Sequence, residues 1–471
     1  MDWKKEINSQ KEALLNDLVD LLKIPSVKDL STSSEQAPMG KAIKQALNLM
    51  LSKSERDGFR TKNIDHYVGF AELGPEDASH YIAILCHLDV VPATGEWAHD
   101  PFTPFLQDGK LYARGAIDDK GPTMAAYYAL KILKENNLPL KHRVRIIFGT
   151  DEESGMSCMK KYVQTEPDPL TGFAPDAEFP IIHAEKGQIN AILKWKQTGI
   201  LNAEGNRLIS FISGEKGNMV PDTATAKITG NQLDGVKEEF RTFAANENLE
   251  HSIEEYDSMM VLTLKGKSAH GMEPFKGINA GLKLADFIVT RSIVNHPYLQ
   301  FISERLAEDF FGKKLNIAFH DEITGPLTVN AGIFRHVPNE EAIITLNIRC
   351  PVETPYLRTI EKLSEVVQEY GFEIEAVREK KPHHVAKNHP VIKVLQQAYE
   401  EESQRPAELL TTGGATYARF LNNGVAYGAV FPGKENTAHQ KNEYVEIEDL
   451  YRAAAIYANA IYHLANLDIN E

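Results

Sequence analysis

Short apolar runs of strand length alternate with helix-length segments over the first 186 residues of the chain. Residues 81–91 and 142–149 are apolar runs of strand length, whereas residues 120–137 carry apolar side chains at helical spacing. Helices that alternate with buried strands are typical of a layered α/β domain with a largely parallel sheet.

The same alternation returns after residue 382, but the residues in between have a different pattern. Residues 187–382 mix strands such as 259–270 with helices such as 278–294. We therefore predict an α/β domain with a mixed sheet, made of residues 1–186 and 383–471, which is split by an inserted α+β domain at 187–382. The insertion has about 200 residues, enough for two small α+β units at ordinary domain sizes.

The net charge and the cysteine spacing argue against several classes of binding partner and of site. The net charge of −15 disfavours nucleic acid and anionic membrane, since both need a basic surface. The cysteines Cys86, Cys158 and Cys350 lack CxxC spacing, which argues against a disulfide framework and against a thiolate zinc site. The N-terminal residues have an amphipathic helical pattern instead of a signal peptide, and no segment is as long as a membrane span. We expect a cytoplasmic protein with no nucleic-acid and no membrane partner.

Acidic and imidazole side chains follow several of the predicted strands. In open α/β sheets, ligands bind beyond the carboxyl ends of the strands. Crowded carboxylates repel one another unless a cation neutralises them, and a set of imidazoles and carboxylates without cysteine suits zinc, manganese or cobalt. The residues are His87 with Asp89, Asp118 with Asp119, Asp151 with Glu152 and Glu153, Asp176, and His439 near the C-terminus.

Each of these features also has an ordinary structural explanation. A single histidine at a strand end is more often a hydrogen-bonded core residue than a ligand. The pair Glu152–Glu153 could be a solvated loop, and two aspartates before a helix commonly cap it. Their joint occurrence at several strand ends favours a metal site.

Five motifs in order strengthen this interpretation: "CHLDVVPATGEWAHDPFTP", "LYARGAIDDKGP", "GTDEESG", "PDAEFP" and "GKSAHG". Together they resemble the co-catalytic metallopeptidase family that contains aminoacylase and succinyl-diaminopimelate desuccinylase. The resemblance runs over almost the whole chain, and the spacing and long insertion look most like those of a bacterial dipeptidase. It implies a hydrolase that cleaves unblocked dipeptides, β-alanyl dipeptides such as carnosine among them, with a catalytic α/β domain and an α+β lid.

The resemblance also implies two divalent metal ions per chain, with zinc favoured over manganese and cobalt. By position, His87 and Asp176 resemble ligands of one ion, and Glu153 and His439 resemble ligands of the other. Asp118 resembles the carboxylate that bridges both ions, because the bridging residue of the family stands two before the lysine, here Lys120.

Two further carboxylates match family positions near the metals. Asp89 resembles the carboxylate that orients the metal-binding imidazole of His87, a task that requires an acceptor for its other ring nitrogen. Glu152 matches the general base that takes a proton from water and passes it to the leaving amine.

The inserted domain contributes residues that the resemblance assigns to substrate. His270 and Asn218 would stabilise the oxyanion, and Arg349 would bind the C-terminal carboxylate through its planar fork. Gly414, beside Gly413, would let main chain approach the substrate. From the residues alone, a salt bridge for Arg349, a turn role for Asn218 and a tight turn at the glycines remain open.

Two other functions stay open beside the metallodipeptidase. One is a related amidohydrolase that deacylates N-acyl amino acids, and the other is a non-catalytic binding protein on the same scaffold. Retention of Glu152 and of all the expected ligands argues against the second.

In dimeric relatives the oxyanion histidine comes from the partner subunit. Here the long insertion leads us to expect that a monomer suffices for activity, although a dimer could form.

Overall fold

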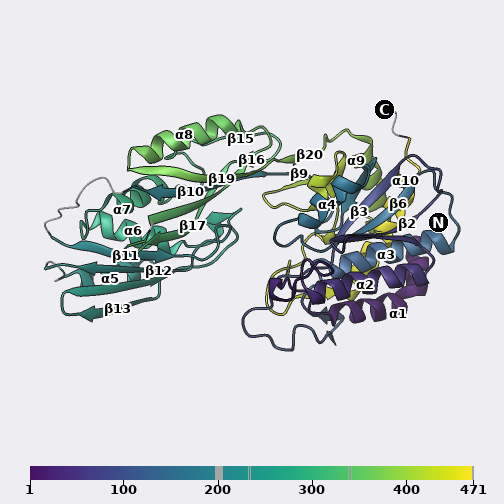
Figure 1. Ribbon diagram of the computed structural model, residues 1–471, viewed down its shortest axis with the longest axis horizontal. Coiled ribbons are helices and arrows are strands. Elements are labelled where there is room, and N and C mark those ends of the chain that lie inside the picture. The colour runs from purple at the N-terminus through teal and green to yellow at the C-terminus, as the bar shows by residue number, and fades with distance from the viewer. Residues whose placement is uncertain (197–204, 232, 234, 338, 341, 469–471) are drawn as a thin grey trace. The chain divides into compact units, whose positions relative to one another are not determined.

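The computed structural model describes residues 1–196, 205–231, 233, 235–337, 339–340 and 342–468 (Figure 1). Contacts divide the chain into two compact units. Unit 1 comprises Met1–Ala184, His384–Thr411 and Ala415–Glu471, and unit 2 comprises Glu185–His383 and Thr412–Gly414. The chain changes unit at 184/185 and 383/384, where the sequence suggests 186/187 and 382/383. The return of Thr412–Gly414 to unit 2 has no counterpart in the sequence prediction.

Unit 1 is built on a nine-stranded mixed sheet. Strand β3 pairs in parallel with β6 and β7, and β7 pairs in parallel with β22, whereas the β1–β2 and β2–β6 pairs are antiparallel. In sheet order the strands are β1 (Arg60–Ile64), β2 (Val68–Leu73), β6 (Arg143–Gly149), β3 (Tyr81–His87), β7 (Thr171–Ala174), β22 (Gly424–Ala426), β9 (Ile181–Glu185) and β20 (His383–His384), with β21 (Leu409–Thr412) paired to β9.

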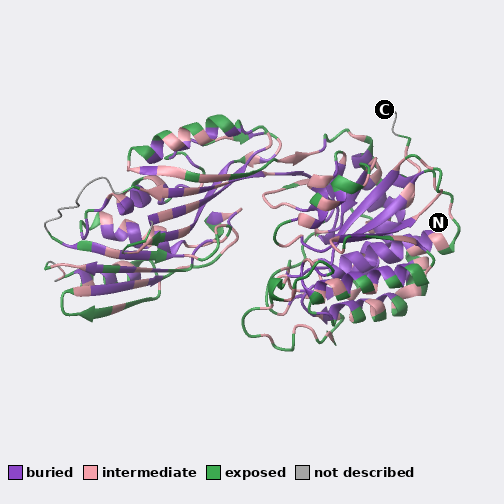
Figure 2. Ribbon diagram, in the orientation of Figure 1, coloured by how far each residue is buried: buried purple, intermediate pink, exposed green. Residues whose placement is uncertain are grey.

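Helices cover this sheet because alternate strand residues face two hydrophobic layers. Along β3, Ile82 and Ile84 pack into one core cluster, while Ala83 and Leu85 pack into a cluster on the other face. Figure 1 shows α1, α2 and α3 together on one side of the sheet, and Figure 2 shows the buried strands between the layers. The helices are α1 (Trp3–Leu22), α2 (Lys41–Arg56), α3 (Lys120–Glu135), α4 (Ser157–Thr165), α9 (Pro390–Ser403) and α10 (Ile447–Ala465).

Unit 1 also contains short strands that lie outside the nine-stranded sheet. They are β4 (Phe105–Gln107), β5 (Lys110–Tyr112) and β24 (Tyr444–Glu446), which form one small sheet, and β8 (Ala177–Glu178) paired with β23 (Ala429–Val430). The apolar run at residues 425–432 has the length of one strand, but the chain forms β22 and β23 there with a break between them. Gly428 lies in this break with a φ of 84°, a left-handed conformation that interrupts an extended strand.

Unit 2 contains one eight-stranded sheet. Its two four-stranded halves meet where β11 pairs with β17 over three residue pairs, Phe211 with His336 to Ser213 with Phe334. In sheet order the strands are β13 (His251–Tyr256), β14 (Met259–Lys265), β12 (Thr223–Thr229), β11 (Arg207–Ser213), β17 (Thr328–His336), β18 (Ala342–Cys350), β10 (Gly187–Trp195) and β19 (Phe372–Lys380). The unit also has a short β15–β16 pair (His320–Asp321, Gly325–Pro326) and the helices α5 (Val236–Asn246), α6 (Ala280–Thr290), α7 (Pro297–Phe301) and α8 (Tyr356–Gln368).

The two faces of this sheet differ in polarity. Ile189, Ile348 and Val329 point into the hydrophobic core of unit 2. Each of these has an asparagine next to it in its strand, pointing to the opposite face. Asn190 (β10) and Asn330 (β17) are both paired directly with Asn347 (β18). The unit therefore has a polar face on which hydrogen-bonding side chains are arranged in register.

The predicted α/β fold class with a mixed sheet and an α+β insertion is confirmed. Among the described residues, we find no helix whose length and apolar character would let it pass through a bilayer.

A histidine cluster in unit 2 makes stability depend on pH. Burial and the neighbouring His336 lower the pKa of His296 to about 4, and burial also lowers the pKa of His336. The rings of His296 and Trp195 lie 4.9 Å apart, and His296 accepts a hydrogen bond from the Tyr298 amide at the start of α7. The folded state therefore disfavours the charged imidazolium.

We predict that the neutral state of His296 contributes stability that is present above pH 6.5 and is lost as the pH falls towards 4. The loss between pH 7.5 and 4.5 is about 2–3 kcal/mol. Urea unfolding at both pH values measures it in the wild type and in His296→Asn, which keeps a capping group but cannot titrate. The difference in pH dependence isolates this residue from other titrating groups. An equal pH dependence in both proteins would contradict the prediction.

Candidate metal centre

The polar residues predicted from the sequence follow strand ends in unit 1. His87 is the last residue of β3, and Glu152 and Glu153 follow β6. Asp118 precedes α3, and Asp176 lies between β7 and β8. Because β3, β6 and β7 are neighbours in the sheet, the loops after their carboxyl ends come together on one edge.

His87 faces two of these carboxylates. Its Nε2 lies 3.0 Å from Asp118 Oδ1 and 3.7 Å from Asp176 Oδ2. Burial opposes a charged imidazole here, but the hydrogen bonds to Asp118 and Asp89 and the charge of Asp176 raise the pKa of His87 well above its ordinary value. His87, Asp118 and Asp176 thus form one group of closely spaced oxygen and nitrogen donor atoms.

A second group forms around His439, in the loop between β23 and β24. Its Nε2 lies 3.0 Å from Asp118 Oδ2 and 3.0 Å from Glu153 Oε2. Burial lowers the pKa of His439, but hydrogen bonds to Asp118 and Glu153 outweigh this effect and raise it to about 11. Asp118 therefore takes part in both groups, with one carboxylate oxygen in each.

Glu152 lies beside the first group. One of its carboxylate oxygens, an Asp176 oxygen and a ring nitrogen of His87 all lie within 4.8 Å of one another. Burial and the negative charges of Glu153 and Asp118 raise the pKa of Glu152 well above its ordinary value, although the charge of His87 opposes this. A raised pKa makes the carboxylate a better proton acceptor.

Asp89 contacts His87 differently from the way the sequence suggests. We expected its carboxylate to hold the imidazole, but His87 Nδ1 lies 2.9 Å from the main-chain oxygen of Asp89 and 3.6 Å from its carboxylate. The carboxylate instead accepts hydrogen bonds of 3.1 Å from the amides of Glu152 and Glu153. Asp89 thus fixes the imidazole through its main chain and the glutamate loop through its side chain.

Asp119 and Asp118 point to different partners. Asp119 stands at the N-cap position of α3, yet its side chain does not cap the helix. Its Oδ2 accepts hydrogen bonds from the His87 amide and from Thr123 Oγ1. The structure therefore places Asp118, and not Asp119, between the two imidazoles.

The donor set fits divalent cations. Four carboxylates and two imidazoles converge without a thiol, and burial together with mutual repulsion raises the pKa of Asp176 and Glu153. Positive charge is needed to stabilise such a cluster in its ionised form. Histidines bind metal as neutral imidazoles, so a bound cation would supply the charge that protonated His87 and His439 otherwise carry.

In unit 2, the loops that carry Asn218 and His270 are joined to each other. The Gly271 amide donates to the Asn218 carbonyl at 2.7 Å, and Met219 and His270 form an isolated antiparallel bridge. Asn330, on the polar face of the sheet, donates to the carbonyls of Gly217 and Met219 at 2.9 Å each. The two residues that the family resemblance assigns to the oxyanion thus share one hydrogen-bonded segment.

Arg349 lies on the same polar face and is only 3% exposed. Its Nε donates to Asn347 Oδ1 and its Nη1 donates to the Gly413 carbonyl, both at 2.8 Å. The Gly414 amide donates to Thr412 Oγ1. The contact with Gly413 explains why Thr412–Gly414 belongs to unit 2.

Sequence reasoning missed Glu443, Arg114 and Asn330. Glu443 is fully buried and accepts hydrogen bonds from the amides of Ile117 and Asp118. Burial and the charge of Asp118 raise its pKa to about 7, although Arg114 opposes this. These residues bind main chain or one another, so no metal-ligand spacing marks them. The only sequence signal is that Glu443 is charged where the chain enters a strand.

The sequence is similar to that of known proteins over nearly its full length. The model of Peptidase family M20/M25/M40 matches residues 83–463. The Bacillus subtilis protein named "Putative dipeptidase YtjP" is 43% identical over 470 residues, which cover 99% of this chain and 100% of that protein. The Staphylococcus haemolyticus protein named "Putative dipeptidase SH1171" is 41% identical over 98% of this chain and 99% of its own length.

Solved structures show the same fold at lower identity. Human carnosine dipeptidase 1 aligns with a TM-score of 0.58 at 14% identity, over 99% of this chain and 98% of that one. A tripeptidase from Staphylococcus aureus aligns with a TM-score of 0.57 at 17% identity, over 97% and 99% of the two chains. The family resemblance inferred from the five motifs is confirmed.

Because Asp118 contacts both His87 and His439, we can predict how many metal ions the protein and its variants bind. We expect the metal-stripped protein to bind two zinc or cobalt ions, Asp118→Asn to bind both far more weakly, and His439→Ala to lose only one. Equilibrium dialysis followed by elemental analysis measures the bound metal without relying on activity. Asp57→Asn is a matched control, because Asp57 is a carboxylate of unit 1 that pairs with Lys53 and Lys131 away from the site. Asp118→Asn protein that still binds both ions tightly would refute this arrangement.

Proposed function

The chain belongs to peptidase family M20/M25/M40, and on that premise we propose that it is a dinuclear metallodipeptidase that hydrolyses unblocked dipeptides. The observation that carries the proposal is the convergence of His87, Asp118, Glu153, Asp176 and His439 on one edge of the unit 1 sheet. Relatives that match nearly the full chain carry the name "Putative dipeptidase", which supports the substrate class.

The metal ligands are assigned by their contacts and by the resemblance. His87 and Asp176 would hold one ion, Glu153 and His439 the other, and Asp118 both. Bound divalent ions would polarise the substrate carbonyl and lower the pKa of a water molecule between them. Zinc suits this mixture of imidazole and carboxylate ligands, and manganese and cobalt are the alternatives.

Glu152 is the proposed general base. Its amide is held by Asp89, so that its carboxylate lies beside His87 and Asp176. Its raised pKa suits it to accept a proton from the attacking water and to deliver that proton to the amine that leaves. Glu153, the next residue, contacts His439, so we propose that it binds the metal and does not act as the base.

The residues of unit 2 are proposed to bind the substrate. His270 and Asn218 would stabilise the oxyanion, and their shared segment would let them act together. Arg349 would bind the C-terminal carboxylate of the dipeptide, since a guanidinium can form two parallel hydrogen bonds to it. Gly414 would present main chain to the substrate. A deacylase of N-acyl amino acids would need the same carboxylate contact but no free amine.

We also propose that the enzyme works in the cytoplasm. Cys86, Cys158 and Cys350 are free and buried, and a reducing compartment would keep them so.

A substrate panel tests the function. We expect hydrolysis of dipeptides, β-alanyl-histidine among them, with little hydrolysis of tripeptides or N-acetyl amino acids. Activity should disappear after treatment with a strong chelator and return with zinc, manganese or cobalt. Preference for N-acetyl amino acids would favour the deacylase, and full activity after verified metal removal would contradict both.

The Glu152→Gln variant tests the general base. We expect kcat to fall by about 10²–10⁴-fold, because a neutral amide cannot accept the proton, while bound metal stays at the wild-type level. Steady-state kinetics and elemental analysis of the same sample separate the two effects. Near-normal turnover by the metal-loaded variant would rule out this role for Glu152.

Mixed subunits test whether one chain suffices. Inactive Glu152→Gln protein is combined with inactive His270→Ala protein under conditions that allow subunits to exchange. We expect no recovery of activity, because His270 is proposed to serve the metals of its own chain. Recovered dipeptide hydrolysis would show that the histidine acts across subunits.

A further inference from the structure

A buried carboxylate joins the two loops that supply ligands to the second metal ion. Glu443 has no exposed surface, and its Oε1 accepts hydrogen bonds from the amides of Ile117 at 3.0 Å and Asp118 at 3.2 Å. Glu443 lies at the end of the loop that carries His439, just before β24. One side chain therefore connects the main chain of Asp118 to the segment that positions His439.

The second oxygen of this carboxylate has a charged partner. Glu443 Oε2 lies 2.6 Å from Nη1 of Arg114, whose side chain is 2% exposed. The guanidinium also stacks over the ring of Trp97, at 5.0 Å from its centre. Because two buried charges cost desolvation free energy, such a pair is weak evidence for stability alone. A role in placing the neighbouring loop accounts better for it.

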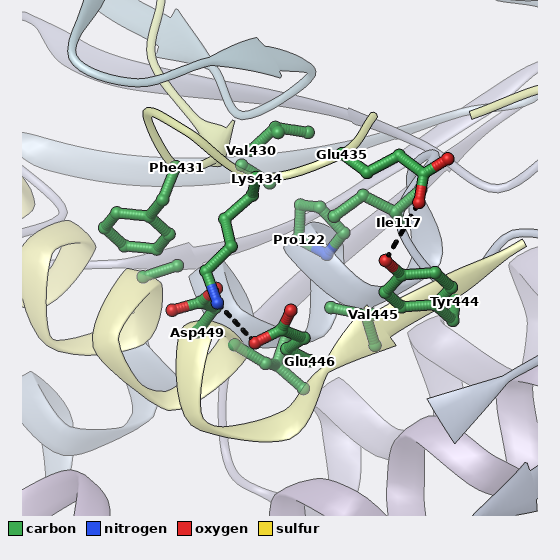
Figure 3. A pocket seen from close by; sticks show the side chains of 13 residues that line it. Ile117, Pro122, Val430, Phe431, Lys434, Glu435, Tyr444, Val445, Glu446 and Asp449 are labelled. Atoms are coloured by element: carbon green, nitrogen blue, oxygen red, sulfur yellow. Dashed lines mark hydrogen bonds and ion pairs between the residues drawn. The ribbon is translucent and has the colours of Figure 1, made fainter. Parts of the chain in front are cut away.

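Other contacts close the base of the His439 loop. The Tyr444 amide donates to Thr437 Oγ1, and Thr437 Oγ1 lies 3.1 Å from the Tyr444 carbonyl. Figure 3 shows the ion pair between Lys434 and Glu446 and the hydrogen bond from Tyr444 to Glu435. These contacts fix the loop to itself and to β24.

The elements around the contact between Glu443 and the Asp118 main chain are also packed together. Ile117 and Tyr444 line the same small cavity in Figure 3, whose volume is about 30 Å³. A cavity of this size holds about one water molecule and no dipeptide. The Ala113 amide donates to the Glu443 carbonyl, and β24 pairs with β5. Between these fixed elements, Glu443 is the side chain that reaches the Asp118 amide.

We propose that Glu443 is a positioning residue for the second metal ion, setting the separation between Asp118 and His439 through its contacts with the Asp118 main chain and with Arg114. The proposal rests on the ligand set given under the proposed function. Glu443 does not itself touch the metal or the substrate. Its removal should therefore weaken the site shared by Asp118, Glu153 and His439 more than the site of His87 and Asp176.

Metal titration of Glu443→Gln tests the proposal. Zinc and cobalt are titrated into the stripped variant and followed by calorimetry and by the visible absorption of cobalt. We expect the first ion to bind as in the wild type and the second to bind about 10–100-fold more weakly, as is typical when a group that supports a metal ligand is changed. At saturating metal, KM should stay near the wild-type value.

Glu72→Gln is the matched control. Glu72 is another buried carboxylate of unit 1, paired with Arg145 at 2.6 Å and with Arg143, away from the metal ligands. Both variants remove one buried negative charge, so both should lose stability. Only Glu443→Gln should lose affinity for the second ion.

Hydrogen exchange in the stripped wild type gives a second test that needs no variant. The Asp118 amide should exchange slowly without metal, because Glu443 holds it independently of the ion. Rapid exchange of that amide, or a second-ion affinity in Glu443→Gln equal to that of the wild type, would overturn the proposal. A wild type that binds only one ion, or hydrolyses no dipeptide, would instead overturn the proposed function.

Discussion

The carboxylate of Asp118 contacts two imidazoles that come from opposite ends of the chain, His87 through Oδ1 and His439 through Oδ2. This contact requires that the end of β3, the start of α3 and the loop before β24 meet at one point. The mixed sheet of unit 1 makes this possible, because parallel strands end at the same edge and leave their loops side by side. This arrangement brings several buried negative charges close together, and nearby positive charge is needed to stabilise them.

Acidic side chains outside the proposed ligand set hold this arrangement in place. Asp89 fixes the amides of Glu152 and Glu153, Asp119 fixes the amide of His87, and Glu443 fixes the amide of Asp118. In each case a carboxylate binds the main chain of a residue assigned to the centre. Ligands positioned through their main chain keep their side chains available for the cation. The acidic residues near the centre thus include groups that hold main chain as well as the proposed ligands.

Much of the fold follows from the sequence. β3 and β6 are apolar runs of strand length, α3 carries apolar side chains at helical spacing, and all three lie near their expected bounds. The candidate ligands follow from their places at strand ends, and their assignment to particular ions comes from the family resemblance. The contacts of Asp89, Glu443 and Asn330 could not be predicted, since an acceptor or donor for main chain leaves no characteristic spacing. The break at Gly428 could not be predicted either, because it lies in an apolar run and is caused by backbone conformation, not by side-chain polarity.

The central claim is that Asp118 is shared by two metal ions. Anomalous diffraction at the zinc edge, from crystals grown with zinc, locates the ions directly. The account predicts two peaks, one among His87, Asp118 and Asp176 and the other among Asp118, Glu153 and His439. A single peak, or two peaks of which only one contacts Asp118, would contradict it.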